Sequence, residues 1–196
     1  MARAPVVGVA ITITLVLLAP RIARADGWTA ALGLAASWQE RRDFGENTRA
    51  NFVPELVGFG YLPLAGTRLF LRPGARLAYS GLTQVEMPDA VQIEERDLTA
   101  TGEVGIVLDG PVIPSLTVGA GAASRWISLD VEQPVNASRE RISRHQLLGS
   151  GYLQAGLGIP LVRGVLLAEP IIRYEQISGD ERAHWRFGVE LTAQLF

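Results

Sequence analysis

The chain has 196 residues, of which 48% are hydrophobic and 19% charged, and it contains no cysteine. Its 18 basic residues, all arginine, are outnumbered by 20 acidic residues, so the charge balance does not indicate a nucleic-acid partner. The lack of cysteine excludes a disulfide framework, a thiol nucleophile and a cysteine metal site.

The first 25 residues have the pattern of a secretory signal peptide. Arg3 precedes an apolar run from Val6 to Ala19, and Ala23-Arg24-Ala25 has the small-x-small form of a signal peptidase site. The apolar run is too short to span a bilayer as a helix, and no later stretch reaches the required length. We therefore expect residues 1–25 to be removed and residues 26–196 to form one exported domain.

The remainder of the chain alternates between segments of period-two hydrophobicity and charged segments. In the first of them Trp28, Leu32 and Trp38 lie on one face, and small or polar residues lie on the other. This alternation predicts strands rather than helices. Eight strands are predicted, at residues 28–38, around Glu55, and at residues 69–80, 97–108, 116–126, 146–159, 166–174 and 185–195.

The connections between these strands alternate in length. The short ones, residues 62–67, 109–114 and 160–164, are rich in residues that favour tight turns. The long ones, residues 40–51, 81–97, 128–144 and 175–184, hold most of the charged residues that follow the signal peptide. This predicts an all-β fold: an eight-stranded antiparallel up-and-down transmembrane β-barrel with short periplasmic turns, four longer external loops and both termini in the periplasm.

Six large aromatic residues fall at the same end of their strands and in phase with the apolar face. Such a set is typical of the aromatic girdle at a membrane–water interface. The predicted girdle comprises Trp38, Phe52, Tyr79, Trp126, Tyr174 and Trp185. A soluble up-and-down barrel such as a lipocalin is the main alternative, but its outer face would carry many charges, whereas the polar face here is mostly Gly, Ala, Ser and Thr.

This pattern resembles the small eight-stranded bacterial outer-membrane barrels of the OmpA/OmpX-like class over the whole exported domain. The chain ends in an aromatic residue, Phe196, although its position in the alternation falls on the interior face. The resemblance implies outer-membrane lipid, lipopolysaccharide and the barrel assembly machinery as partners, and a monomer. It implies no cofactor or metal and no enzymatic activity.

Nine charged residues fall on the face that the alternation turns into the lumen. They are Glu55, Arg72, Arg76, Glu103, Arg125, Glu169, Arg173, Arg186 and Glu190. Because burying an unpaired charge is costly, we expect them to form an Arg–Glu network. A network that only fills and rigidifies a narrow barrel is the simpler interpretation. A gated pore for small solutes is the alternative.

Two further hypotheses concern the external end. Some small outer-membrane barrels modify lipid A with a serine and a histidine at the rim, and Ser143 and His145 share a face here, but in the reverse of the order found in the deacylase family. His184 is the chain's other histidine. The external arginines are candidates for lipid phosphate groups, namely Arg41, Arg42, Arg139, Arg141 and Arg144.

Overall fold

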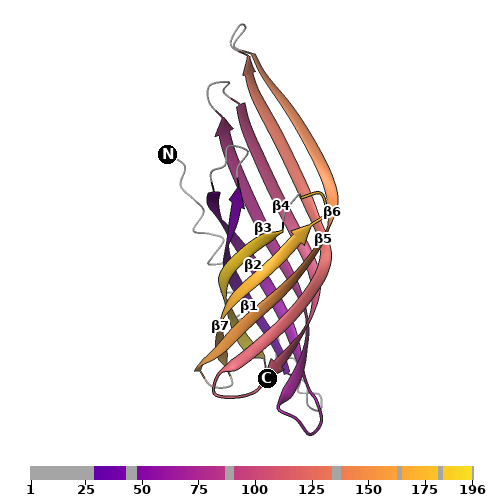
Figure 1. Cartoon of the computed structure of the whole chain (residues 1–196), viewed down its shortest axis with the longest axis vertical. Coiled ribbons are helices and arrows are strands. Elements are labelled where there is room, and N and C mark those ends of the chain that lie inside the picture. The colour runs from indigo at the N-terminus through magenta and orange to yellow at the C-terminus, as the bar shows by residue number, and fades with distance from the viewer. Residues whose placement is uncertain are drawn as a thin grey trace.

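The protein is a single closed barrel of eight antiparallel strands in sequence order (Figure 1). The computed structural model describes residues 29–42, 48–86, 91–133, 138–162, 165–180 and 183–195. The expected signal peptide and Phe196 lie outside the described residues. Each strand pairs with its sequence neighbours, and β1 pairs with β8 to close the ring. The described residues include no helix that is long and apolar enough to cross a membrane.

The strands differ greatly in length. They are β1 (Thr29–Arg42), β2 (Thr48–Pro63), β3 (Leu69–Glu86), β4 (Val91–Leu108), β5 (Ile113–Gln133), β6 (Ser138–Val162), β7 (Leu166–Ile177) and β8 (His184–Leu195). The longest, β5 and β6, have 21 and 25 residues, against about 9–11 that a tilted strand needs to cross a bilayer. The hairpins β3–β4 and β5–β6 therefore continue well above the ring of strands (Figure 1).

At the end of the barrel where long loops were predicted, the prediction is wrong for many of the residues, which are strand. The ladder between β3 and β4 continues to the pair Glu86 and Val91, and that between β5 and β6 continues to Gln133 and Ser138. β1 likewise extends to Arg42. The outward apolar face of the ring does not continue into these extensions, because polar residues take its positions, yet the backbone hydrogen bonds of the strands remain intact. The predicted loops at residues 81–97 and 128–144 are thus mostly extended strand.

The opposite end of the barrel has the predicted short turns. In the β2–β3 turn the amide of Leu64 donates to the carbonyl of Leu69, and Gly66 supplies the positive φ of 76° that the turn needs. The β4–β5 connection spans residues 109–112. β6 and β7 meet with a register irregularity between Pro160 and Val162.

Burial agrees with the predicted facing along β5 within the ring and around Glu55. Along β5, Leu116 and Val118 are 54% and 50% exposed on the outside, while Ser115 and Thr117 on either side of Leu116 are buried. In β2, whose faces are both apolar, Glu55 points inward, whereas Phe52 and Leu56 are exposed. The exterior is therefore an apolar surface, and the interior holds the polar side chains.

Apolar side chains pack together at the turn end of the interior. A cluster of buried residues there consists of Ala31, Ala35, Val57, Phe59, Tyr61 and Val107, with Phe70 and Ile113 packed against it. This cluster meets the charged residues at Phe59, whose ring centre lies 4.5 Å from the guanidinium carbon of Arg72. Hydrophobic contact therefore contributes to filling the barrel at this end.

Two interior glycines make room for the polar side chains. A methyl group at Gly119 would collide with the ring of Tyr152, and one at Gly156 would collide with the carboxylate of Glu169 and the hydroxyl of Ser115. Gly102, by contrast, has open space where a methyl group would stand. The absence of a side chain at the first two positions thus belongs to the packing of the interior.

We expect Gly156→Ala to lower the free energy of unfolding by about 1–3 kcal/mol, because overpacking displaces Glu169 from its partners. The matched control, Gly102→Ala, should change it by less than about 0.5 kcal/mol. Urea titration of the folded barrel in detergent micelles, followed by tryptophan fluorescence, measures both. Equal losses in the two variants would contradict the packing described.

Candidate functional site: the charged interior

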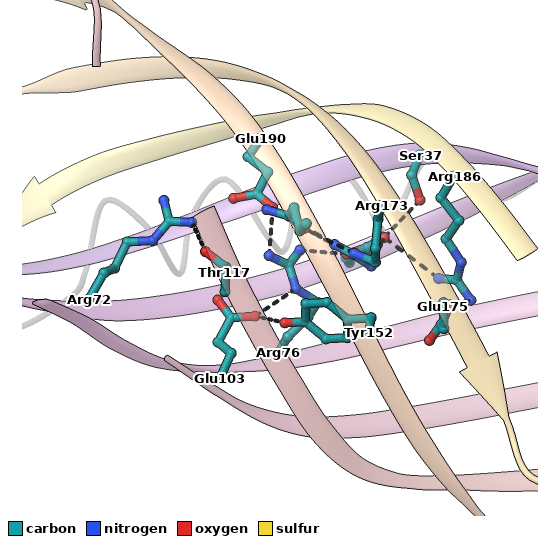
Figure 2. Close-up of polar contacts among 12 residues, drawn as sticks. Ser37, Arg72, Arg76, Glu103, Thr117, Tyr152, Arg173, Glu175, Arg186 and Glu190 are labelled. Carbon is teal, nitrogen blue, oxygen red and sulfur yellow. Dashed lines mark hydrogen bonds and ion pairs between the residues drawn. The ribbon is translucent and has the colours of Figure 1, made fainter. Parts of the chain in front are cut away.

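All nine charged residues that the alternation turns inward are buried, none more than 7% exposed. Every strand except β1 and β6 contributes at least one of them. Their side chains meet across the barrel rather than along a strand, because opposite strands of a narrow barrel lie within reach of arginine and glutamate. Figure 2 shows the central part of this arrangement.

Arg76, on β3, lies at the centre and bonds three carboxylates. Its three nitrogens donate to Glu55 at 2.5 Å, to Glu190 at 2.5 Å and to Glu103 at 3.1 Å. These acids come from β2, β8 and β4, so a single guanidinium connects four strands. Tyr152 donates its hydroxyl hydrogen to the same Glu103 oxygen (Figure 2).

The carboxylate of Glu55 lies close to three buried arginines. Besides Arg76, it accepts two hydrogen bonds from Arg173, at 3.1 and 2.9 Å, and Arg186 lies 3.7 Å away. Ser37 of β1 also donates to it at 2.7 Å. The fork of Arg173 thus engages both oxygens of the carboxylate, the geometry in which an arginine–carboxylate pair is strongest. Glu55 is consequently the residue on which the central network depends most.

Separate pairs lie on either side of this centre. Towards the turn end, Arg72 donates to Glu169 at 2.8 Å and to Thr117 at 2.8 Å. Towards the long hairpins, Arg125 binds both oxygens of Asp97, at 2.9 and 3.0 Å. The charged residues therefore fill successive levels of the barrel, from Arg72 to Arg125.

Several members of this network are absent from the nine predicted residues. Asp97 and Asp180 both bind Arg125, Glu175 binds Arg186 at 2.6 Å, and Gln154 and Tyr152 contact Arg173.

Strand parity could have found four of these additional members, because Tyr152 and Gln154 fall on the inward face of their predicted strand. Asp97 stands on the inward face at the first residue of its predicted strand, and Glu175 continues the inward alternation one step beyond the predicted end of its strand. Nothing in the sequence indicates that Asp180, which follows β7, reaches into the interior.

Acids outnumber bases in the interior. Five arginines are buried there, against six buried carboxylates, namely Glu55, Asp97, Glu103, Glu169, Glu175 and Glu190. Glu95 and Asp180 add their carboxylates beside Arg125, at 2.9 and 2.5 Å. The interior therefore has a negative excess, which any ion entering it would meet.

The six predicted girdle residues are all exposed on the outside, between 42% and 52%. Three cross-strand ring contacts involve them: Trp38 with Phe52 at 5.8 Å, Tyr174 with Trp185 at 4.9 Å, and Trp126 with the imidazole of His145 at 5.1 Å.

The arrangement of the serines and histidines is not the one that the enzyme hypothesis requires, in which Ser143 would contact His145. His145 Nε2 lies 2.7 Å from the hydroxyl of Ser124, not from that of Ser143. Among the described residues no carboxylate bonds the other nitrogen of this imidazole, the position of the orienting acid in a serine hydrolase. His184 pairs with Asp180 at 3.1 Å. The described residues contain no group of histidines and acids that could hold a metal ion.

The five external arginines are only partly covered by the structure. The side chains of Arg41, Arg42 and Arg139 lie outside its described part. Arg141 and Arg144 are described, and both line a groove on the outer face of the sheet.

The closed ring, its apolar exterior and its charged interior define a class, the small up-and-down β-barrels whose solved examples include bacterial outer-membrane proteins. No protein-family model matches the chain. No curated protein matches it either.

Solved structures share the fold. Crystal structures of Neisserial surface protein A and of a major outer membrane protein from Thermus thermophilus are 12% and 13% identical to the chain, both with a TM-score of 0.52. They match 87% and 85% of this chain and 98% and 99% of theirs. The attachment invasion locus protein Ail of Yersinia pestis is 13% identical with a TM-score of 0.51, over 85% of this chain and 97% of its own. At this identity the likeness establishes the fold.

We expect Glu55→Gln to destabilise the barrel by about 3–5 kcal/mol, because it leaves Arg76 and Arg173 buried without their shared anion. Glu94→Gln is the matched control, because Glu94 pairs with the exposed Arg96 outside the barrel, and its loss should cost less than about 1 kcal/mol. Urea unfolding in micelles compares the two. A Glu55→Gln protein as stable as the control would show that the central network contributes little.

Proposed function

We propose that the protein is a monomeric integral outer-membrane barrel with a structural or surface-interaction role, whose interior is plugged by the Arg–Glu network. The observation that carries this proposal is the reversed polarity of the barrel. Charged side chains such as Arg76 and Glu190 are buried inside, while large apolar side chains such as Leu153 and Phe187 are exposed outside. Only a lipid environment makes such an exterior favourable.

The depth and direction of insertion follow from the girdle and the turns. Trp38, Tyr79 and the other four aromatics would lie at the external membrane surface, with the β3–β4 and β5–β6 hairpins above it. The short turns would lie in the periplasm together with both termini. Removal of residues 1–25 by signal peptidase would precede insertion, and the mature protein should then begin at Asp26. The C-terminal segment ending in Phe196 would be offered to the barrel assembly machinery.

The interior supports a plug because its charged groups bind across the barrel at several levels. Arg76 joins four strands, and Arg72 and Arg125 close the levels on either side. Moving any of these arginines would leave buried carboxylates unpaired, which is costly. The role would then lie in the membrane-facing surface and in the hairpins above it.

A narrow pore for small cations is the second candidate. The excess of acids favours it, as do buried carboxylate oxygens without a hydrogen-bond partner among the described residues, Glu103 Oε1 and Glu190 Oε2. Partner exchange among the arginines would open such a path. The plug and the pore make opposite predictions for the conductance of the unmodified protein.

We expect the full-length folded barrel to give no single-channel events in planar bilayers. Arg76→Ser should produce small cation-selective steps, because it leaves Glu55, Glu103 and Glu190 without their central cation and admits water. Arg96→Ser, which removes an exposed external charge, should stay silent. Regular conductance steps from the unmodified protein would favour the pore over the plug.

A further inference from the structure

A groove of about 670 Å³ lies on the outer face of the sheet, outside the barrel's interior. We propose that it binds the phosphorylated sugar head group of an outer-leaflet glycolipid, an inference that rests on the proposed outer-membrane location. The groove is lined by Tyr79, Glu94, Arg96, Trp126, Ile127, Ser128, Arg141, Ser143, Arg144 and His145.

The strand register places the groove's residues in two rows. Arg96, Trp126 and His145 are paired across β4, β5 and β6, and form the lower row. Glu94, Ser128 and Ser143 are paired in the same way two residues further out. All six belong to the outward alternation of their strands, which turns lipid-facing residues such as Leu98 and Leu147 outward below them. The groove is thus continuous with the membrane-facing surface.

The lower row also indicates where the groove would lie relative to the membrane. Trp126 and Tyr79 belong to the aromatic girdle, and girdle aromatics lie at the level of lipid head groups. The imidazole of His145 stacks on Trp126 with an interplanar angle of 25° and is held by Ser124 at 2.7 Å. These rings form a flat lower wall where the acyl region ends, so the polar groups above them face head groups rather than acyl chains.

Two arginines supply the charge for a phosphate. Arg96 donates two hydrogen bonds to one oxygen of Glu94, and Arg141 approaches the other oxygen at 3.8 Å. Arg141 also lies 3.6 Å from Asp130 and 3.3 Å from the hydroxyl of Ser128. Glu94 therefore shows that an anion can sit between the two guanidinium groups.

A phosphate could replace Glu94 as the partner of these two arginines. The side chains of Arg96 and Arg141 are 54% and 63% exposed, and ion pairs at such exposure contribute little to stability. Most donors of Arg141 make no hydrogen bond to a described residue. A phosphate accepts the planar guanidinium fork in bidentate form, which a single carboxylate oxygen at 3.8 Å does not match.

The remaining lining suits the sugar of the head group. The hydroxyls of Ser128 and Ser143 stand beside the arginines and can both donate and accept, as sugar hydroxyls require. The volume is within the range of about 300–1,000 Å³ usual for small-molecule sites. Arg96 lies in the row of the aromatic rings and Arg141 lies one pair beyond the serine row, so guanidinium groups flank the hydroxyls on both sides, as a phosphorylated sugar requires.

The test is binding of bis-phosphorylated lipid A to the full-length folded protein in mixed micelles, measured by native mass spectrometry against the same lipid after removal of its phosphates. We expect the phosphorylated lipid to bind about tenfold more tightly. Arg96→Gln and Arg141→Gln should each remove most of that preference. Arg68→Gln, which deletes an exposed arginine in a turn at the opposite end, should keep it. Soluble glucosamine phosphate should compete at high concentration, since it carries the recognised groups.

Equal binding of the two lipids by the unmodified protein would overturn the inference, as would an equal loss in the Arg68→Gln control. The first comparison needs no variant, so it decides the matter even if a substituted barrel fails to fold. Tighter binding of a soluble acidic protein segment than of lipid A would also contradict it. Cell fractionation separates this result from the proposed function. A protein found in the outer membrane that binds both lipids equally would contradict only the proposed binding site. Phosphate-dependent binding by a protein found in another compartment would contradict the proposed location instead.

Discussion

The closed backbone ladder is the constraint on which the rest of the structure depends. Pairing of β1 with β8 leaves no strand edge within the ring, and every residue then faces either outward or inward in strict alternation. Glu55, Arg76 and Glu190 cannot avoid the interior once this ladder has closed, and so they must find partners there. The Arg–Glu network is thus a consequence of strand parity as much as of charge.

The same alternation gives the two ends of the barrel different roles. At the turn end, Phe59 and Tyr61 belong to an apolar cluster that packs next to Arg72. At the other end the ladder of β3 to β6 continues beyond the ring, and the outward face that is apolar within the ring carries Arg96 and Arg141 there. With the interior plugged as proposed, recognition would fall to this outer surface.

Period-two alternation in the sequence predicted the number of strands and which residues face inward or outward, but not the strand ends or the contacts across the barrel. The facing of Glu55 and Trp126 follows from parity alone, so fold and facing could be predicted. The extension of β5 to Gln133 could not, because the alternation reverses its polarity beyond Trp126: Ile127, Leu129 and Val131 fall on the parity that is inward within the ring. Partners across the barrel, such as Arg76 with Glu190, also depend on barrel geometry that neighbouring residues do not encode. The bond that joins a histidine of β6 to a serine of β5 depends on register in the same way.

The most direct test of the reversed polarity uses the chain's lack of cysteine. Nitroxide labels on Leu116→Cys, Thr117→Cys and Val118→Cys, in barrels folded into lipid bilayers, report collisions with dissolved oxygen and with a water-soluble nickel complex. We predict that the labels at 116 and 118 collide with oxygen and not with nickel, while the label at 117 is shielded from both. Nickel collisions at 118, or no alternation along the strand, would contradict an apolar exterior around a filled, charged interior.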